Sequence, residues 1–247
     1  MTILFQLKIY FMTLKNLKIL ITGGTAGLGL ELAKEFLKME ARVIITGLDL
    51  QSLESVLLKL NHINLSGFVA DITDSKSLQQ LSKQVGNIDV LINNAGIYTV
   101  GKLEEVALEK IEKVISTNLI GTISITQTFL PQFKAKNKGI IANILSIRSN
   151  QPAAESSIYV ASKFGLRGFF ESLKLELADT GIQIINFYPS GMKTNLFQTA
   201  TMIDKDMANM MEPSDVASIV VDNIQRSDKT LIDHVVIQKP KRVMDST

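Results

Sequence analysis

Two side chains in the segment SSIYVASKFGL (156–166) have the types and spacing that proton transfer requires, namely Tyr159 and Lys163. Residues four apart on a helix share a face, so both side chains can reach one cleft. A free phenol has a pKa of about 10 and transfers protons poorly at neutral pH. A nearby ammonium group favours the phenolate and lowers that pKa, towards the range where acid–base catalysis is effective. The pair therefore predicts a tyrosine that exchanges a proton with a substrate.

Ser146 is the third candidate, at the end of the apolar run GIIANILS (139–146) and thirteen residues before Tyr159. Strand ends on the carboxyl side of a parallel sheet open onto the ligand crevice. A hydroxyl there can donate a hydrogen bond to a carbonyl oxygen that gains negative charge. Ser149 is a weaker alternative, because we expect it in the following loop. Arg148 and Glu155 border the same region and could contact a substrate, although exposed surface charge is the simpler interpretation.

A glycine-rich segment, ITGGTAGLG (21–29), joins the first apolar run to the first helical pattern. Gly23, Gly27 and Gly29 have the spacing G-x-x-x-G-x-G. Such glycines permit a tight turn and bring bare backbone close to a pyrophosphate, which then faces a helix N-terminus. A plain strand–helix turn is the alternative, but the position between a strand and a helix favours dinucleotide binding.

The elements that must position these residues alternate between strand and helix. We expect strands at 17–22, 42–46, 66–70, 88–93, 139–146, 182–188 and 234–238. We expect helices at 27–39, 51–60, 75–85, 157–179 and 213–224, and a long helical stretch from about 103 to 133, with a break into two as an alternative. The strands are continuous Val/Ile/Leu runs, typical of sheets covered on both faces. The pattern predicts a single doubly wound α/β domain with a parallel sheet, a three-layer α/β/α Rossmann fold.

Composition excludes several classes of function. The 247 residues suffice for one large α/β domain, and a net charge of +2 does not indicate a nucleic-acid partner. The absence of cysteine excludes disulfides, thiol nucleophiles and thiolate metal sites. His62 and His234 stand in no ligand spacing, so we expect no metal.

The apolar N-terminus, MTILFQLKIYFM, is too short to span a bilayer and has neither a basic n-region nor a cleavage site. Met12 opens a compact lead-in to the first strand. We therefore expect residues 1–13 to be an N-terminal extension, with 1–11 arising from an upstream start codon, and 14–247 to form the Rossmann domain. We also expect a cytoplasmic protein.

Taken in order, these motifs resemble those of the short-chain dehydrogenase/reductase family, in its single-domain branch. The glycine loop resembles the T-G-x-x-x-G-x-G loop of that family, and NNAG (93–96) matches its motif after the fourth strand. Asp71 matches the adenine-contacting aspartate and Asn118 the helix-4 asparagine. YPSGMKT (188–194) is similar to the segment after the sixth strand. The resemblance covers roughly residues 14 to 240.

The resemblance implies hydride transfer between nicotinamide C4 and a substrate carbon, with Tyr159 exchanging the hydroxyl proton. By the same resemblance, Lys163 bonds the nicotinamide ribose, Ser146 orients the carbonyl, and Asn118 holds a water that links Lys163 to solvent. The family usually has two serines where this chain has Leu145–Ser146. The second position is the catalytic one, so the role is kept.

The resemblance also implies NAD(P) as cofactor. The residues expected to contact it are Gly23, Gly24, Thr25, Gly27, Leu28, Gly29, Asp71, Ile72, Asn94, Ala95, Gly96, Tyr159, Lys163, Met192 and Thr194. The choice between NAD and NADP stays open. Gly47 occupies the usual acidic position after the second strand, Leu48 the usual arginine position, and Asp49 lies one residue further on. Ala26 stands where NADP-using relatives often carry a basic residue.

Substrate specificity is expected in the segment 195–213, which is rich in methionine (Met202, Met207, Met210 and Met211). These residues could form a lid over a partly apolar substrate or could face the core. The family usually forms homo-oligomers, so we expect a homodimer or homotetramer, with the apolar helix at 164–177 as a contact.

The leading interpretation is an oxidoreductase acting on a carbonyl or secondary alcohol. An epimerase or dehydratase shares this fold and the Tyr–Lys pair, but usually has a larger C-terminal substrate domain. A non-catalytic dinucleotide-sensing regulator is the third hypothesis, although such proteins often lack the tyrosine.

Overall fold

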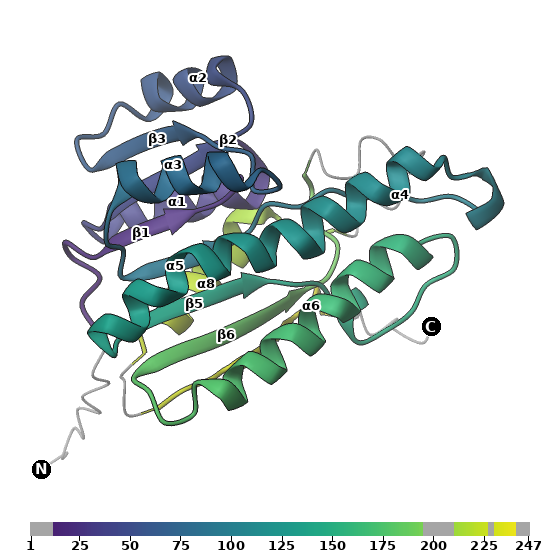
Figure 1. Ribbon diagram of the computed structural model, residues 1–247. Helices are drawn as coiled ribbons and strands as arrows, with labels where there is room; N and C mark the ends of the chain where they lie inside the picture. Colours follow the sequence, from purple (N-terminus) through teal and green to yellow (C-terminus); the bar gives the residue numbers. More distant parts are fainter. Residues whose placement is uncertain (1–11, 195–209, 227–229, 241–247) are drawn as a thin grey trace, which may run out of the picture.

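The computed structural model, described here for residues 12–194, 210–226 and 230–240, contains one parallel sheet (Figure 1). Its seven strands have the order β3-β2-β1-β4-β5-β6-β7. They are β1 (Lys18–Ile21), β2 (Arg42–Gly47), β3 (Leu65–Val69), β4 (Val90–Asn93), β5 (Gly139–Ile144), β6 (Ile182–Pro189) and β7 (His234–Ile237). The order reverses between β1 and β4, which is where open α/β sheets form their ligand crevice.

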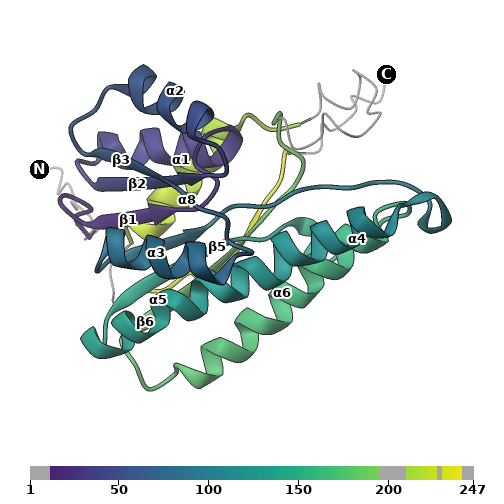
Figure 2. The same cartoon turned by 45° about the horizontal axis from the view of Figure 1, so that its top comes forward.

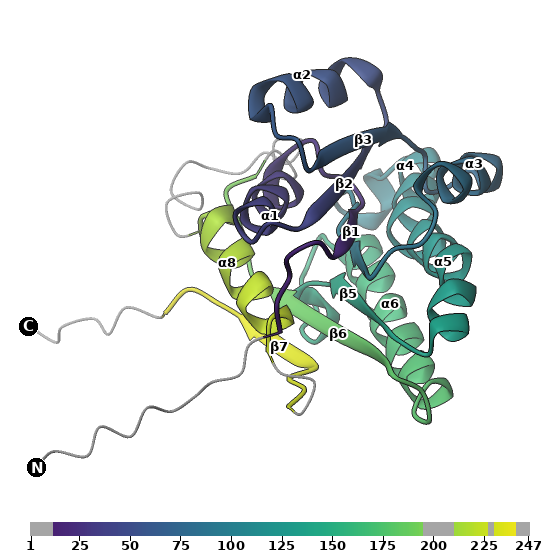
Figure 3. The ribbon, with the colours of Figure 1, turned by 90° about the vertical axis from the view of Figure 1, so that its left-hand side faces the viewer.

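Helices cover both faces of the sheet, as Figure 3 shows. The helices α1 (Gly27–Lys38), α2 (Leu50–Leu60) and α8 (Pro213–Ile224) lie on one side. The helices α3 (Ser75–Val85), α5 (Thr122–Lys136) and α6 (Ser157–Glu176) lie on the other. The predicted three-layer Rossmann fold is therefore confirmed.

The core consists of two layers, one on each face of the sheet. Along β1, Ile19 and Ile21 pack towards α1 and α8, whereas Leu20 packs towards the layer that contains α3 and α5. Alternate residues of a strand point to opposite faces, so a strand buried on both faces must be apolar throughout. The edge strands β3 and β7 are only partly buried.

The long helical stretch differs from the expectation at its start and in its middle. A 3₁₀ turn, η1 (Leu103–Glu105), comes first, and α4 (Leu108–Ile115) begins after it. The helix then runs through a π-helical turn, η2 (Ser116–Gly121), directly into α5. The helix is thus continuous, with the irregular turn in place of a break. Figure 2 shows α4 lying beside α6.

The N-terminal segment and the methionine-rich segment 195–213 are only partly within the described residues. Met12 donates its backbone N–H to the Gln225 carbonyl at 2.6 Å, and Leu14 is buried, so the described chain joins the fold from Met12 onward.

Residues 1–11 and 195–209 lie outside the described residues, and the expectations for them, including Met202 and Met207, stay predictions. Met210 and Met211 are buried, and Met211 packs in the core layer that contains α1 and α8, in agreement with the core-facing alternative. None of the described helices is long and apolar enough to cross a bilayer.

Candidate active site

The glycine loop closes on itself so tightly that side chains are excluded. Gly23 and Gly27 have φ values of +65° and +52°, in the left-handed region that favours glycine. A Cβ on Gly29 would overlap the Gly23 carbonyl oxygen, and one on Gly24 would lie 2.5 Å from the Ile45 Cβ. The loop leads into α1, whose first turn has no side-chain cap. Its backbone N–H groups are therefore available to an anion.

The segment after β4 is bound to this loop by a short hydrogen-bond network. Thr22 Oγ1 accepts from the backbone N–H groups of Asn94 and Ala95, each at 3.0 Å. The Asn94 amide Nδ2 donates to the carbonyls of Thr22 (2.9 Å) and Gly23 (3.0 Å). The Asn94 side chain thus holds the loop in shape. Sequence reasoning missed Thr22, although its position directly before Gly23 matches the T-G start of the motif.

The opposite side of the loop faces Thr194. A Cβ on Gly27 would lie 3.2 Å from Thr194 Cγ2, and a shallow cleft runs between the loop and the ion pair of Lys193 with Glu212. Thr194 Oγ1 is buried and has no hydrogen-bond partner among the described residues. Bare backbone, an uncapped helix and an orphaned hydroxyl together fit a dinucleotide. The Met192 side chain is buried in the core, so only its backbone is suited to a cofactor contact.

The remaining expected cofactor residues lie at the same edge of the sheet. Asp71 is exposed beyond the end of β3, and its Oδ1 accepts from Thr73 N (2.8 Å) and Thr73 Oγ1 (2.7 Å). Ile72 is buried in the core. Leu28 is also buried, facing the core beneath α1, and Thr25 is partly exposed in the loop.

The end of β2 carries no group that selects a cofactor. Asp49 caps α2, because its Oδ1 accepts from Ser52 N at 2.7 Å, and that hydrogen bond lowers the pKa of Asp49. Its side chain is therefore directed to the helix. A Cβ on Gly47 would lie 2.6 Å from Thr25 Cγ2, and Leu48 is 70% exposed. The structure leaves the choice between NAD and NADP open.

The three candidate catalytic side chains converge at the ends of β5 and α6. Tyr159 and Lys163 lie in the first turns of α6 and are 7% and 5% exposed. The Ser146 side chain lies near enough to the Tyr159 hydroxyl to favour its phenolate form. Lys163 Nζ lies 5.8 Å from the centroid of the Tyr159 ring and donates to the Ile144 carbonyl at 3.1 Å.

Burial dominates the electrostatics of this cluster. It raises the pKa of Tyr159 to about 12, although the nearby Ser146 hydroxyl and the positive charge of Arg148 act in the opposite direction. It also lowers the pKa of Lys163 to about 8. The expectation of a lowered tyrosine pKa is wrong for this structure. The reason is that the free energy needed to remove a phenolate from water exceeds the stabilisation that its polar neighbours provide.

Asn118 lies in the π-helical turn, fully buried beside Lys163. Its Nδ2 donates to the Ile97 carbonyl (2.9 Å) and to Ser162 Oγ (3.1 Å), and its Oδ1 accepts from Ile97 N (2.8 Å). Ser162 Oγ donates in turn to the Tyr159 carbonyl at 2.7 Å. The Asn118 side chain therefore connects the segment after β4 to the first turns of α6. π-helical turns are frequent at functional sites.

Comparison with known proteins agrees with this geometry. The family described as short chain dehydrogenase matches residues 17–204. The chain belongs to the short-chain dehydrogenase/reductase (SDR) family. An uncharacterized oxidoreductase of Saccharomyces cerevisiae is 34% identical over 224 residues, which cover 86% of this chain and 72% of the relative.

Two further SDR proteins carry informative names. An NADP-dependent 3-hydroxy acid dehydrogenase of Schizosaccharomyces pombe is 29% identical over 230 residues, covering 87% of this chain and 89% of the relative. The closed form of a serine dehydrogenase complexed with NADP+ superposes with a TM-score of 0.82 at 25% identity, covering 90% of this chain and 94% of that one. This SDR protein is therefore an oxidoreductase that uses NAD(P) and acts on CH–OH or C=O groups.

The structure adds residues to the SDR site that sequence reasoning missed. The ring of Tyr98 packs edge-on against Tyr159 with centroids 4.8 Å apart, and its hydroxyl shares a hydrogen bond of 3.0 Å with Ser156 Oγ. The only available signal was its place two residues after NNAG. Ser149, the alternative to Ser146, is fully buried within η3 (Ile147–Ser149), away from solvent. Among the described residues, no group of three or more His, Asp or Glu could hold a metal ion.

Proposed function

We propose that this SDR enzyme reduces a carbonyl compound, with Tyr159 as the proton donor, Ser146 as the group that orients the carbonyl, and Lys163 as the cation that stabilises the phenolate. The observation that carries the proposal is the buried cluster of Tyr159, Ser146 and Lys163, in which Lys163 Nζ lies 5.8 Å from the centroid of the Tyr159 ring.

When bound at this site, a reduced dinucleotide would supply the hydride. The electron pair of the carbonyl π bond moves onto oxygen, and the hydroxyl of Ser146 donates a hydrogen bond to that oxygen as charge develops. Tyr159 then gives up its proton to the same oxygen. With a pKa of about 12, Tyr159 keeps its proton at neutral pH until a more basic oxygen forms, which suits the reductive direction. Lys163, with a pKa of about 8, is mostly protonated at neutral pH and offsets the charge of the phenolate.

Asn118 has a positioning role in this proposal. Its amide fixes Ile97 and, through Ser162, the backbone of Tyr159. A water relay from Lys163 to solvent beside Asn118 stays part of the proposal. The Asn118 side chain already forms its hydrogen bonds with Ile97 and Ser162, so other atoms would have to hold most of such a water.

The cofactor site is proposed to hold the pyrophosphate at the glycine loop and the first turn of α1, with Thr194 Oγ1 as an additional donor. No acidic side chain stands at Gly47 to repel a 2′-phosphate. We therefore expect turnover with NADPH at least equal to that with NADH. Separate KM values for the two cofactors test this, and a clear preference for NADH would contradict it.

The decisive experiment is a panel of ketones, aldehydes and oxo acids assayed for net oxidation of NADPH and NADH. A reductase consumes reduced cofactor in proportion to alcohol formed. An epimerase regenerates its cofactor and shows no net change, and a sensor binds the dinucleotide without turnover. Binding measured by calorimetry, with no turnover on the whole panel, would overturn the proposal.

We also propose a homo-oligomer that uses the outer face of α6. Phe164 and Leu175 lie exposed on this helix, and Ile120 is exposed in the π-helical turn that contacts it. Apolar side chains exposed together favour an interface. Light scattering after size-exclusion chromatography tests this, with Leu175→Lys expected to shift the protein towards monomer.

A further inference from the structure

Arg148 follows Ser146, the residue proposed to orient the carbonyl, by two positions. It lies in the 3₁₀ turn η3 directly after β5, and its backbone N–H donates to Ser146 Oγ at 3.1 Å. The backbone of Arg148 is thus fixed to the same hydroxyl that is proposed to orient the carbonyl. Its side chain is partly exposed, so solutes can reach it.

The guanidinium group of Arg148 has more N–H donors than the one that bonds to the protein. Nη1 donates to the Pro152 carbonyl at 3.4 Å, and no carboxylate of the described residues forms an ion pair with it. A guanidinium has five N–H donors. The side chain is close enough to the site that its charge lowers the pKa of Tyr159. Arg148 therefore places a positive charge, not neutralised by a described acid, beside the reacting group.

The loop that follows Arg148 is held by contacts with the segment after β4. Gly101 N donates to the Glu155 carbonyl at 2.8 Å, and the hydroxyls of Tyr98 and Ser156 are 3.0 Å apart. Glu155 itself has a φ of +56°, a constrained conformation for a residue other than glycine. The acid nearest in sequence to Arg148 is thus fixed in a turn and makes no ion pair with it. The positive charge is available to a ligand.

We propose that Arg148 binds a carboxylate of the substrate, so that the enzyme prefers oxo acids over neutral ketones. This inference rests on the proposed carbonyl reduction and names its substrate class. A planar guanidinium pairs with a carboxylate through two parallel hydrogen bonds, which fixes orientation as well as charge. The carboxylate itself is unchanged: hydride adds to the carbonyl carbon, and Tyr159 protonates the oxygen.

The test compares a short oxo acid with its methyl ester at the same carbonyl. Wild type is expected to reduce the acid with the higher kcat/KM. Arg148→Gln should lower kcat/KM for the acid by roughly 10- to 100-fold, the range for a lost hydrogen bond to a charged group, and leave the ester nearly unchanged. Arg148→Lys keeps the positive charge but loses the two parallel N–H donors. Its kcat/KM for the acid should therefore lie between the values of wild type and Arg148→Gln.

Arg42→Gln is the matched control, because Arg42 is exposed at the start of β2, at the opposite end of the strands from the site. It should leave both substrates unaffected. An equal loss on acid and ester in Arg148→Gln, or a wild type that reduces ketones and esters but not oxo acids, would overturn the inference while the proposed reduction stands. Absence of reduction of any carbonyl would instead overturn the proposed function. If Arg148→Gln does not fold, the acid-to-ester ratio of wild type and of Arg148→Lys still decides.

Discussion

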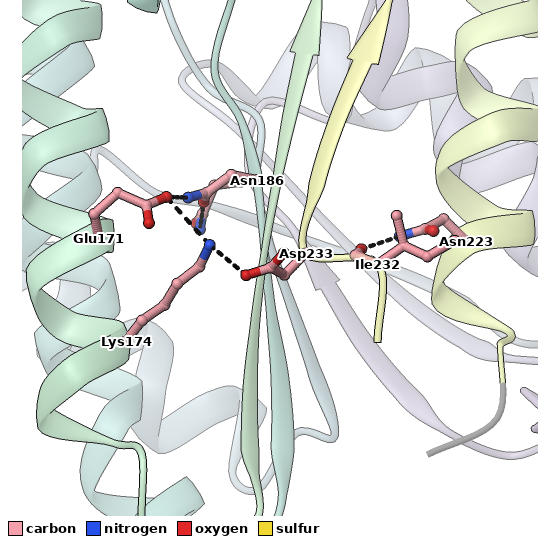
Figure 4. Close-up of polar contacts among 7 residues, drawn as sticks. Glu171, Lys174, Asn186, Asn223, Ile232 and Asp233 are labelled. Atoms are coloured by element: carbon pink, nitrogen blue, oxygen red, sulfur yellow. Dashed lines mark hydrogen bonds and ion pairs between the residues drawn. The ribbon is translucent and has the colours of Figure 1, made fainter. Parts of the chain in front are cut away.

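Helix α6 carries two polar clusters, one towards each end, and the lysine of each cluster has a different kind of partner. In the second cluster (Figure 4), Lys174 Nζ donates to Glu171 Oε1 at 3.1 Å and to Asp233 Oδ2 at 2.9 Å. Asn186 Nδ2 donates to the same Glu171 oxygen at 2.9 Å. In the active-site cluster, Lys163 has one neutral partner, the Ile144 carbonyl, and no carboxylate of the described residues pairs with it.

The second cluster ends a row of asparagines that crosses the sheet. Asn93, Asn143 and Asn186 stand side by side on β4, β5 and β6, and each amide Nδ2 donates to the next acceptor along the row. The Glu171 carboxylate accepts only, so it fixes the direction of the row. A buried row of hydrogen bonds of this kind favours one strand register. This fold therefore pairs charge where strands are held together and leaves charge unpaired where chemistry is proposed.

The largest expected effect comes from the two buried tyrosines near these clusters. Burial raises the pKa of both Tyr159 and Tyr188 to about 12, so the two differ mainly in position. Tyr159→Phe should lower kcat by about 10²–10⁴-fold, the usual contribution of an acid–base group, with cofactor affinity nearly intact. Tyr188→Phe should change kcat by less than about threefold, because its hydroxyl is not placed in the reaction. Similar losses in both variants would remove the distinction between the clusters.

The two lysines should respond to removal with opposite signs in stability. The fall in the pKa of Lys163 from its ordinary 10.5 to about 8 corresponds to a cost of about 3 kcal/mol for its charged form at neutral pH. Lys163→Met should therefore inactivate the enzyme and raise its free energy of unfolding. Lys174→Met should retain kcat and lower the free energy of unfolding by about 1 kcal/mol, since it leaves two partly exposed carboxylates unpaired. Urea unfolding and steady-state kinetics of both variants check this. A destabilised Lys163→Met would show that its packing outweighs its charge.

The difference in the free energy of unfolding between wild type and Lys163→Met should decrease as pH rises. Between pH about 8 and 10.5 the unfolded chain keeps the Lys163 proton that the folded chain has lost, so wild-type stability rises with pH in that window. Tyr159 acts in the opposite sense between pH 10 and about 12, where the folded chain holds a proton that the unfolded chain has released. Urea midpoints of both proteins across the lower window test this. A gap that stays constant there would contradict the depressed pKa of Lys163.

The smallest effect is expected for Asp233→Asn in the second cluster. Its carboxylate is about half exposed, and Lys174 keeps Glu171 as a partner. The loss of stability should therefore be at most about 1 kcal/mol and should diminish at high salt. Thermal unfolding at two ionic strengths measures it. A larger, salt-independent loss would mean that Asp233 is required for the pairing of β7.

Local pattern was sufficient for much of the fold. The apolar runs that became β1 and β4 and the helical stripe of α1 depend on residues close together in the chain, so their periodicity shows in the sequence. The same holds for the glycine loop, whose missing side chains are required by its own tight closure. The start of α4 and the π-helical turn could not be predicted, because contacts of Asn118 with Ile97 and Ser162 hold that turn.

By itself, the sequence determined the family, the order of the elements and the pairing of Tyr159 with Lys163 on one helical face, since these depend on residue type and short spacing. The tertiary structure decided how deeply that pair is buried, and so the direction in which the pKa of Tyr159 moves. It also decided that Arg148 lies beside the site without a described acid to neutralise it, whereas Lys174 meets two carboxylates. Burial and charge pairing are set by groups far apart in the chain, and only folding brings them together.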